Sequence, residues 1–191
     1  MNSRQETAAQ RLTLLLLLGI STPLAAQNTN EDAPEASNTL VFADETKIEI
    51  SYRQLTLAGG RNLKTLMSKG VQGDSARKYY NEQYLPAFLD GSIELTSAIA
   101  LGQQEVKKGV YGFTFRLDGE LTWLFVLTKG PKDVCDIALE AETNKRKQAK
   151  RLIVQPIATA DDETEGFLSI RYGPLSAKVP FSPSKATTAG K

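Results

Sequence analysis

The sequence predicts an all-β domain, a two-sheet antiparallel β-sandwich with one short inserted helix, and three observations support this prediction. Apolar and polar residues alternate with a period of two along many segments, which is the pattern of half-buried strands. Turn signals such as Asp118-Gly119 separate these segments. Only the stretch at about residues 74–85 combines a helix start with a helix stop. We therefore expect one sandwich domain over residues 39–181.

The N-terminal segment, residues 1–26, has the order of a secretory signal peptide. Arg4 and Arg11 precede an apolar run over residues 12–20, and small residues follow up to Ala26. The apolar run is too short for a membrane span, which needs roughly 20 residues. We therefore predict cleavage near Ala26, export to the periplasm or the extracellular space, and no membrane span.

Two segments that flank the predicted domain have the composition of disordered chain. Residues 27–38 are polar and acidic, and residues 182–191 are rich in Ser, Thr, Ala, Gly and Lys. Neither segment has enough large apolar side chains to offset the entropy cost of ordering it. We expect a disordered tether at 27–38 and a disordered tail at 182–191.

The first half of the domain contains two predicted strands and the predicted helix. Alternation over residues 48–53 and 93–101 indicates the strands. The helix at 74–85 lies between them, with Asp74 as the expected N-cap and Pro86 as the expected stop. The helix is therefore an insertion in a chain of strands.

The strongest hairpin signal is Asp118-Gly119, which lies between two apolar rows. A three-residue loop with Gly119 in the left-handed region pairs Phe115 with Leu121 and gathers both rows on one face. A two-residue loop would instead pair Phe113 with Leu124, so the two apolar rows would point to opposite faces of the hairpin. We predict the three-residue loop and expect the aromatic residues, Trp123 included, to form core.

Residues 134–142 fit two structures. With Asp133 as N-cap they would start a helix, whereas the alternation of Ile137 and Leu139 with acidic residues would form a strand. The local pattern does not separate the two. Cys135 lies in this segment and is the only cysteine of the chain, so we expect it to be a buried apolar residue. Further strands are predicted at 152–158, 167–172 and 175–181.

Composition excludes several classes of function. The chain has 191 residues and no histidine, which removes Ser-His-Asp triads and His-ligated metals. One cysteine removes disulfide frameworks and multi-Cys metal sites. A net charge of +1, from 23 basic and 22 acidic side chains, gives no field of the kind that nucleic-acid partners need. We therefore expect no nucleic-acid partner, no metal and no cofactor.

A series of motifs follows the domain from Ile48 to Phe181. Its positions are Tyr52, Arg53, Gly60, Arg61, Gly91, Glu94, Thr96, Gly109, Tyr111, Trp123 and Val179-Pro180-Phe181. The order resembles the bacterial exported domain-of-unknown-function family 2911. Members of that family look like a strand with Tyr-Ser-Arg-Pro and Gly-Arg, then Trp-Arg-x-Gly-Ala-Asn-Glu-Ala-Thr, Leu-Pro-Ala-Gly-x-Tyr-x-Leu, a Trp strand and a terminal hairpin ending in Val-x-Val-Pro.

The resemblance implies that the chain is a divergent member with an all-β fold, and it favours a strand at 134–142. It brings no known activity. Leu89 and Ile93 stand where the family pattern has Arg and Asn, so the polar pair of the family is replaced here by apolar side chains.

The polar residues that match the family pattern define a candidate ligand site: Arg53, Arg61, Glu94 and Thr96. Glu94 facing inward beside either arginine would form a buried ion pair of the kind found at functional sites. The alternative is that Glu94 lies on the solvent face of its strand. A second carboxylate near Glu94 would favour an enzyme in which Glu94 acts as acid or base.

Three tyrosines of the predicted helix, Tyr79, Tyr80 and Tyr84, define a second candidate surface. Their rings and hydroxyls suit a glycan or a partner protein. Alternatively Tyr80 and Tyr84, four residues apart, pack the helix onto the sheet.

We consider three hypotheses of function. The first is an exported, non-catalytic binding module of the cell envelope for a small polar ligand, a glycan or an envelope protein. The second is a carboxylate-dependent enzyme that uses Glu94. The third is an assembly or interaction protein that acts through the 74–85 helix.

Overall fold

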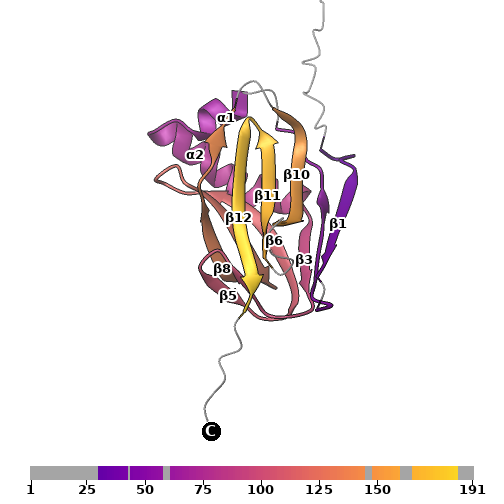
Figure 1. Cartoon of the computed structure of the whole chain (residues 1–191). Helices are drawn as coiled ribbons and strands as arrows, with labels where there is room; N and C mark the ends of the chain where they lie inside the picture. The colour runs from indigo at the N-terminus through magenta and orange to yellow at the C-terminus, as the bar shows by residue number, and fades with distance from the viewer. Residues whose placement is uncertain (1–29, 43, 58–60, 145–147, 160–164, 185–191) are drawn as a thin grey trace, which may run out of the picture.

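The computed structural model describes residues 30–42, 44–57, 61–144, 148–159 and 165–184. Within these ranges the chain forms two antiparallel β-sheets, and the helices lie beside one end of the sheets (Figure 1). The all-β, sandwich-like fold predicted from the sequence is confirmed. The predicted signal peptide, residues 1–26, lies outside the described residues.

The first sheet has six strands in the order β1-β2-β3-β6-β7-β8. Their bounds are Glu35–Val41 (β1), Lys47–Arg53 (β2), Gly91–Leu95 (β3), Gly109–Leu117 (β6), Trp123–Lys129 (β7) and Lys132–Leu139 (β8). Along β2 the buried side chains of Ile48, Ile50 and Tyr52 alternate with half-buried ones. The inner face of β2 is therefore apolar, and its outer face carries polar side chains.

The second sheet has the order β10-β11-β12-β4-β5, and β9 pairs with β12 beside this path. The bounds are Ile99–Leu101 (β4), Gln104–Val106 (β5), Glu142–Thr143 (β9), Ala149–Ala158 (β10), Gly166–Gly173 (β11) and Leu175–Pro183 (β12). β4 and β5 follow β3 in the chain but pair in this sheet, so the chain crosses between the layers after Leu95. The core fills the space between the two inner faces.

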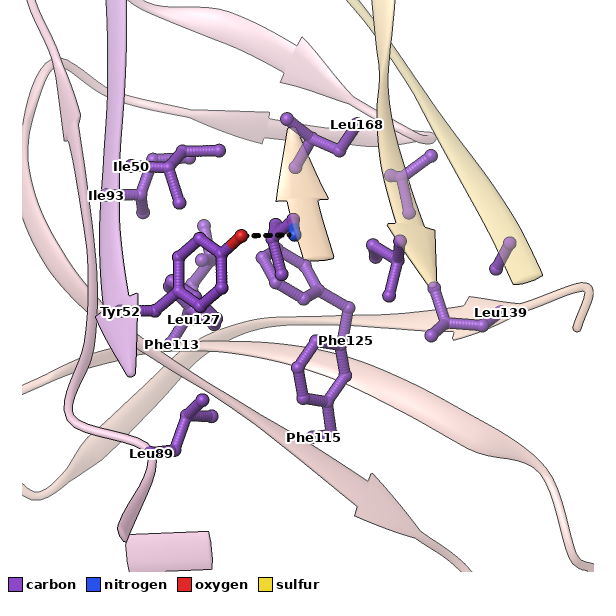
Figure 2. Packing of buried hydrophobic residues seen from close by; sticks show 14 of the residues in the cluster. Ile50, Tyr52, Leu89, Ile93, Phe113, Phe115, Phe125, Leu127, Leu139 and Leu168 are labelled. Atoms are coloured by element: carbon purple, nitrogen blue, oxygen red, sulfur yellow. Dashed lines mark hydrogen bonds between the residues drawn. The ribbon is translucent and has the colours of Figure 1, made fainter. Parts of the chain in front are cut away.

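Aromatic rings form the centre of this core (Figure 2). Phe125 is fully buried, and its ring lies 5.4 Å from that of Phe113 and 5.7 Å from that of Phe115 between centroids. Tyr52 reaches the same cluster, with its ring 6.2 Å from that of Phe113. The expectation that the hairpin aromatics form core is therefore confirmed.

Side chains of the first sheet close the free edge of β10. The N–H of Val154 donates to the Tyr52 hydroxyl at 2.9 Å, the bond drawn in Figure 2, and the Asn38 amide donates to the Val154 carbonyl at 3.0 Å. The N–H of Leu152 donates to the carbonyl of Leu55 at 2.7 Å. An edge strand whose N–H and C=O groups are occupied cannot recruit another strand at these positions.

The folded region extends beyond both predicted boundaries. β1 begins at Glu35, inside the predicted tether, because its backbone pairs along the whole of β2 even though few of its side chains are apolar. β12 continues to Pro183, inside the predicted tail, because Ser182 and Pro183 lie opposite β4. Backbone hydrogen bonds to neighbouring strands order these residues. Amino-acid composition, on which the predicted boundaries were based, does not indicate such bonds.

The register predicted for the β6–β7 hairpin is wrong. Phe115 lies opposite Phe125 and not Leu121, because the loop extends from Asp118 to Thr122. The carboxylate of Asp118 accepts the N–H of Thr122 at 2.8 Å, and the backbone N–H of Asp118 donates to the Thr122 carbonyl at 3.0 Å. Leu121 adopts a left-handed φ of 67°, which is uncommon for a residue with a side chain.

The segment 134–142, which the local pattern left open, contains the end of β8, so the strand alternative is confirmed. Cys135 is buried in this strand as expected, and burial raises the pKa of its thiol. The thiol therefore stays protonated at neutral pH.

The helical insertion is longer than predicted. The insertion begins with a separate helix, α1 (Arg61–Leu66). A continuous helical run follows, which consists of α2 (Val71–Tyr79), a π-helical turn η1 (Tyr80–Tyr84) and α3 (Leu85–Phe88). Asp74 lies in the first turn of α2 and is not its N-cap. Pro86 does not stop the helix, because the chain continues through it into α3 directly after the π-helical turn. Among the described residues, no helix has the length and apolar composition needed to cross a membrane.

Candidate functional site

A pocket of about 170 Å³ lies between the helical insertion and the end of β11. We call it the tyrosine pocket. It is lined by Leu57, Thr65, Leu66, Ala76, Tyr79, Tyr80, Tyr84 and Tyr172. These residues come from the segment after β2, from α1, α2 and η1, and from β11. The packing of the helices against the sheet therefore forms the pocket.

Two buried polar contacts hold the helices in place around the pocket. The guanidinium of Arg77, which is 5% exposed, donates to the carbonyls of Leu66 and Ser68 at 2.7 Å each and pairs with Asp74. The Asn81 side chain donates to the carbonyl of Leu117 at 2.9 Å and accepts its N–H at 3.1 Å. Arg77 fixes the corner between α1 and α2, and Asn81 attaches η1 to the end of β6.

The π-helical turn carries two of the tyrosines. Its bond runs from the N–H of Leu85 to the carbonyl of Tyr80. The rings of Tyr80 and Tyr84 stack with centroids 5.5 Å apart, and the ring of Trp123 meets Tyr80 edge to face at 5.9 Å. π-helical turns occur mostly as single turns and frequently at functional sites. Here the turn places a rigid aromatic wall along the pocket.

A hydrogen-bond network around Asn30 joins the pocket to the chain before β1. The Asn30 side chain, which is 1% exposed, accepts the N–H of Thr56 at 2.7 Å and its hydroxyl at 3.0 Å. Its amide donates to the Thr56 carbonyl at 3.2 Å and to the Tyr84 hydroxyl. The Tyr172 hydroxyl donates to the same Thr56 carbonyl at 3.5 Å. The acceptors of this network therefore already have donors.

Two buried donors at the site make no hydrogen bond. They are the Tyr80 hydroxyl and the indole N–H of Trp123, and their residues are 6% and 5% exposed. The Tyr172 hydroxyl lies near that of Tyr80 but makes no hydrogen bond of normal geometry with it. An unpaired polar group in a buried site costs about 1–3 kcal/mol, so it calls for an explanation.

Burial also sets the protonation of the pocket. It raises the pKa of the Tyr80, Tyr84 and Tyr172 hydroxyls above the ordinary value, and for Tyr84 the hydrogen bond from Asn30 opposes this effect. All three hydroxyls are therefore neutral at physiological pH. A second, smaller pocket of about 20 Å³ adjoins, since Tyr172 lines both and Trp123 lines the second.

The structure does not bring Arg53 and Glu94 together. Arg53 ends β2, whereas Glu94 pairs with Glu49, four positions earlier along the same strand. Four residues of a strand span roughly 13 Å. Arg53 instead lines a polar hollow of about 370 Å³ on the outer face of the first sheet, together with Glu35, Asp90, Ser92 and others.

Glu94 is exposed on the outer face of β3, directly opposite Glu49. Glu49 is thus a second carboxylate near Glu94, which is the feature that we expected to favour an enzyme. It pairs with Lys47, whose ammonium donates at 2.9 Å, and this hydrogen bond and the two negative charges raise the pKa of Lys47. Water reaches the side chains of Lys47, Glu49 and Glu94. The two carboxylates therefore lie on an open surface and not in a pocket that could enclose a substrate.

The remaining predicted site residues have other positions. Thr96 holds the strand ends together, because its hydroxyl accepts the N–H of Lys47 at 2.7 Å. Arg61 begins α1, and its side chain lies outside the described residues. Tyr80 is buried and Tyr84 half-buried, so the tyrosines of the predicted helix are pocket wall, and only Tyr79, at 55% exposure, offers open surface.

Sequence reasoning missed much of the site. Asn30, Leu57 and Tyr172 are its principal omissions, and they are far apart in the sequence. The aromatic spacing in the helix was the only signal that pointed to it. In the described part of the chain, no three or more Cys, Asp and Glu side chains gather as metal ligands.

No family model, no curated protein and no solved structure matches this chain. The resemblance to family 2911 therefore stays a prediction.

Proposed function

We propose that the protein is a non-catalytic binding module that takes a small ligand in the tyrosine pocket. In line with the predicted signal peptide, the module acts in the cell envelope after export. The observation that carries the proposal is Tyr80, which lines the pocket and whose buried hydroxyl makes no hydrogen bond. Pockets with aromatic walls and a few convergent polar groups are the usual form of small-molecule sites.

The chemistry of the lining favours binding over catalysis. The eight lining residues, all within the described part of the chain, include no carboxylate, amine or thiol. Burial raises the pKa of the Tyr80, Tyr84 and Tyr172 hydroxyls, so these three do not act as general bases near pH 7. The arrangement can hold and orient a molecule, and it offers no group to react with it.

Thermal unfolding against a ligand panel tests this proposal. The panel contains neutral ring compounds, oligosaccharides, cell-wall fragments, anions, calcium and lipids. A ligand at 100 times its Kd adds about 2.7 kcal/mol, so a bound class raises the Tm measurably. The variant Ala76→Phe fills the tyrosine pocket, and Ala87→Phe, on the exposed side of α3, is the matched control.

We expect at least one class to raise the Tm of the wild-type protein and of Ala87→Phe, and to leave the Tm of Ala76→Phe unchanged. Each shift is measured against the same variant without ligand, because overpacking alone costs about 1–3 kcal/mol. An equal shift in both variants, or no shift with any class, would contradict binding in the pocket.

A carboxylate-dependent enzyme is the second candidate, because Glu49 lies opposite Glu94. Two neighbouring carboxylates are the usual requirement of acid-base hydrolysis. On this hypothesis Glu94→Gln and Glu49→Gln abolish turnover of a glycoside panel, while Glu105→Gln, an exposed carboxylate on β5, leaves it unchanged. Turnover that survives both changes would remove this candidate.

Exposed apolar side chains on the helices favour the third candidate, an assembly protein. Met67, Val71 and Tyr79 are 38%, 84% and 55% exposed. On this hypothesis the double change Val71→Ser and Tyr79→Ser abolishes capture of an envelope protein without changing the Tm. Val110→Ser, at 63% exposure on β6, is the control. Capture that persists in the double variant would argue against this candidate.

A further inference from the structure

We infer that the ligand of the tyrosine pocket is a neutral molecule of about one ring that carries a hydrogen-bond acceptor, such as a carbonyl oxygen, which the Tyr80 hydroxyl binds. The inference rests on the proposed function, because it names the chemical class that the same pocket takes. Three features of the described residues support it: the volume of the pocket, the charge of its lining and the kind of polar group left unpaired.

The volume limits the size of the ligand. The tyrosine pocket holds about 170 Å³. An apolar cavity of about 150 Å³ is enough to hold benzene. One six-membered ring with a small substituent therefore fits, and the flat walls formed by Tyr80 and Tyr84 favour a ring over a branched chain.

The lining limits the charge of the ligand. None of its eight residues is acidic or basic, and burial raises the pKa of the Tyr80, Tyr84 and Tyr172 hydroxyls, which keeps these three neutral. Transfer of an ionised group from water into such surroundings, without an opposite charge to pair with, is strongly unfavourable. A neutral compound is therefore preferred over an anion or a cation of the same shape.

The unpaired group of the pocket lining defines the polarity of the ligand. The Tyr80 hydroxyl needs an acceptor for its proton. The Thr56 carbonyl already receives Asn30 and Tyr172, and the Tyr172 hydroxyl, which lies near that of Tyr80, makes no hydrogen bond of normal geometry with it. A ligand that offered only a donor would leave the Tyr80 proton unpaired. An acceptor oxygen on the ligand satisfies it.

A set of probes of similar size tests the inference. Acetophenone is neutral with a carbonyl, ethylbenzene lacks the oxygen, and benzoate carries a charge. We would measure the Kd of each probe for the purified protein by NMR titration. We expect acetophenone to bind about tenfold more tightly than ethylbenzene, and benzoate at least tenfold more weakly than acetophenone, in line with one buried hydrogen bond and one unpaired charge.

Two matched tyrosine variants show whether the acceptor meets the intended hydroxyl. Tyr80→Phe removes the unpaired group and keeps the ring, so we expect the ratio of the two Kd values, ethylbenzene to acetophenone, to fall to about one. Tyr111→Phe makes the same chemical change on β6, at a residue that does not line the pocket, and should leave the ratio at about ten. Loss of an unsatisfied hydroxyl does not endanger folding.

The outcomes separate this inference from the proposed function. Equal affinity for acetophenone and ethylbenzene, with both excluded by Ala76→Phe, would overturn the acceptor requirement and keep the binding module. Tightest binding of benzoate would overturn neutrality. Failure of all three probes would overturn the inference, and another ligand class whose Tm shift is lost in Ala76→Phe would still support the module.

Discussion

The outer face of the first sheet and the helix-covered end of the sandwich use polar groups in opposite ways. On the outer face, Lys47 pairs with Glu49, and water reaches both partners and Glu94. At the covered end, the hydroxyl of Tyr80 and the indole of Trp123 are buried without hydrogen bonds. Water can form hydrogen bonds with the exposed groups, whereas the buried hydroxyl and indole are out of its reach. The contrast teaches that polar side chains at the surface are satisfied by water, whereas buried donors without partners are the feature on which the proposed binding function depends.

The largest effect that would test this contrast is expected at neighbouring tyrosines. Tyr80→Ala removes a ring that packs against Tyr84 and Trp123, so it should lower the free energy of unfolding by about 3–5 kcal/mol. Tyr79→Ala, at an exposed position, should change it by less than about 0.5 kcal/mol. Urea denaturation measures both, and similar losses would mean that the covered end is not packed as described.

A second pair compares the two faces of β2. Tyr52→Phe leaves the buried N–H of Val154 without its acceptor and should cost about 1–3 kcal/mol of unfolding free energy. Ser51→Ala changes the neighbouring residue on the outer face, whose hydroxyl lies 3.3 Å from that of Ser37, and should cost less than about 0.5 kcal/mol. Hydrogen exchange at Val154 should become faster only in Tyr52→Phe, and unchanged exchange there would refute the edge closure.

A third pair concerns glycines. Gly173 has a φ of 57°, and an added Cβ would lie 2.3 Å from the Leu57 side chain, which lines the tyrosine pocket. Gly173→Ala should therefore cost about 1–2 kcal/mol and reshape the pocket wall. Gly119→Ala, where no atom lies within 4 Å, should change the unfolding free energy by less than about 1 kcal/mol. Equal stability of the two variants would show that Gly173 is not constrained.

The smallest effect is expected for an outer-face ion pair. Arg116 and Asp133 form two hydrogen bonds, one of them 2.9 Å long, with side chains 39% and 45% exposed. Arg116→Gln should cost about 0.2–1 kcal/mol at pH 7, because solvent screens the pair. The hydrogen bond from Arg116 lowers the pKa of Asp133, so its stabilisation is present above the ordinary pKa and lost as pH falls through the folded value.

The difference in stability between the wild type and Arg116→Gln should therefore disappear at about pH 2, where Asp133 is protonated in both folded and unfolded chains. Urea denaturation at the two pH values checks this. A difference that persists in acid would mean that Arg116 stabilises the sheet by packing and not by charge.

Period-two alternation was enough to predict the two-sheet fold, because side chains of a strand alternate between core and solvent whatever the details of pairing. The same pattern did not determine loop length. In the β6–β7 hairpin, the Asp118 carboxylate and the left-handed backbone of Leu121 close a longer loop than Gly119 suggested. Alternative turns differ little in energy, and local hydrogen bonds of this kind decide between them. The alternation of apolar and polar residues carries no information about these bonds.

The candidate site was predicted less well than the fold. Glu94 attracted attention as a carboxylate among apolar residues, yet its strand simply turns it to solvent. Tyr80 was identified as a candidate, but its unpaired hydroxyl depends on Trp123 and Tyr172, which only the packing of helices on the sheet brings near. Asn30 lay in a segment whose composition indicated disorder, although its side chain is almost fully buried.

The closed edge of β10 also orders events during synthesis of the chain. The partners Tyr52 and Val154 are 102 positions apart, and Asn38 and Val154 are 116 positions apart. At about 5–20 residues per second, a ribosome needs roughly 5–25 s to make the intervening chain. The first strands must therefore remain without these partners until most of the domain has been made. The sandwich closes late, and a chain shortened before β10 leaves the Tyr52 hydroxyl and the Asn38 amide unpaired.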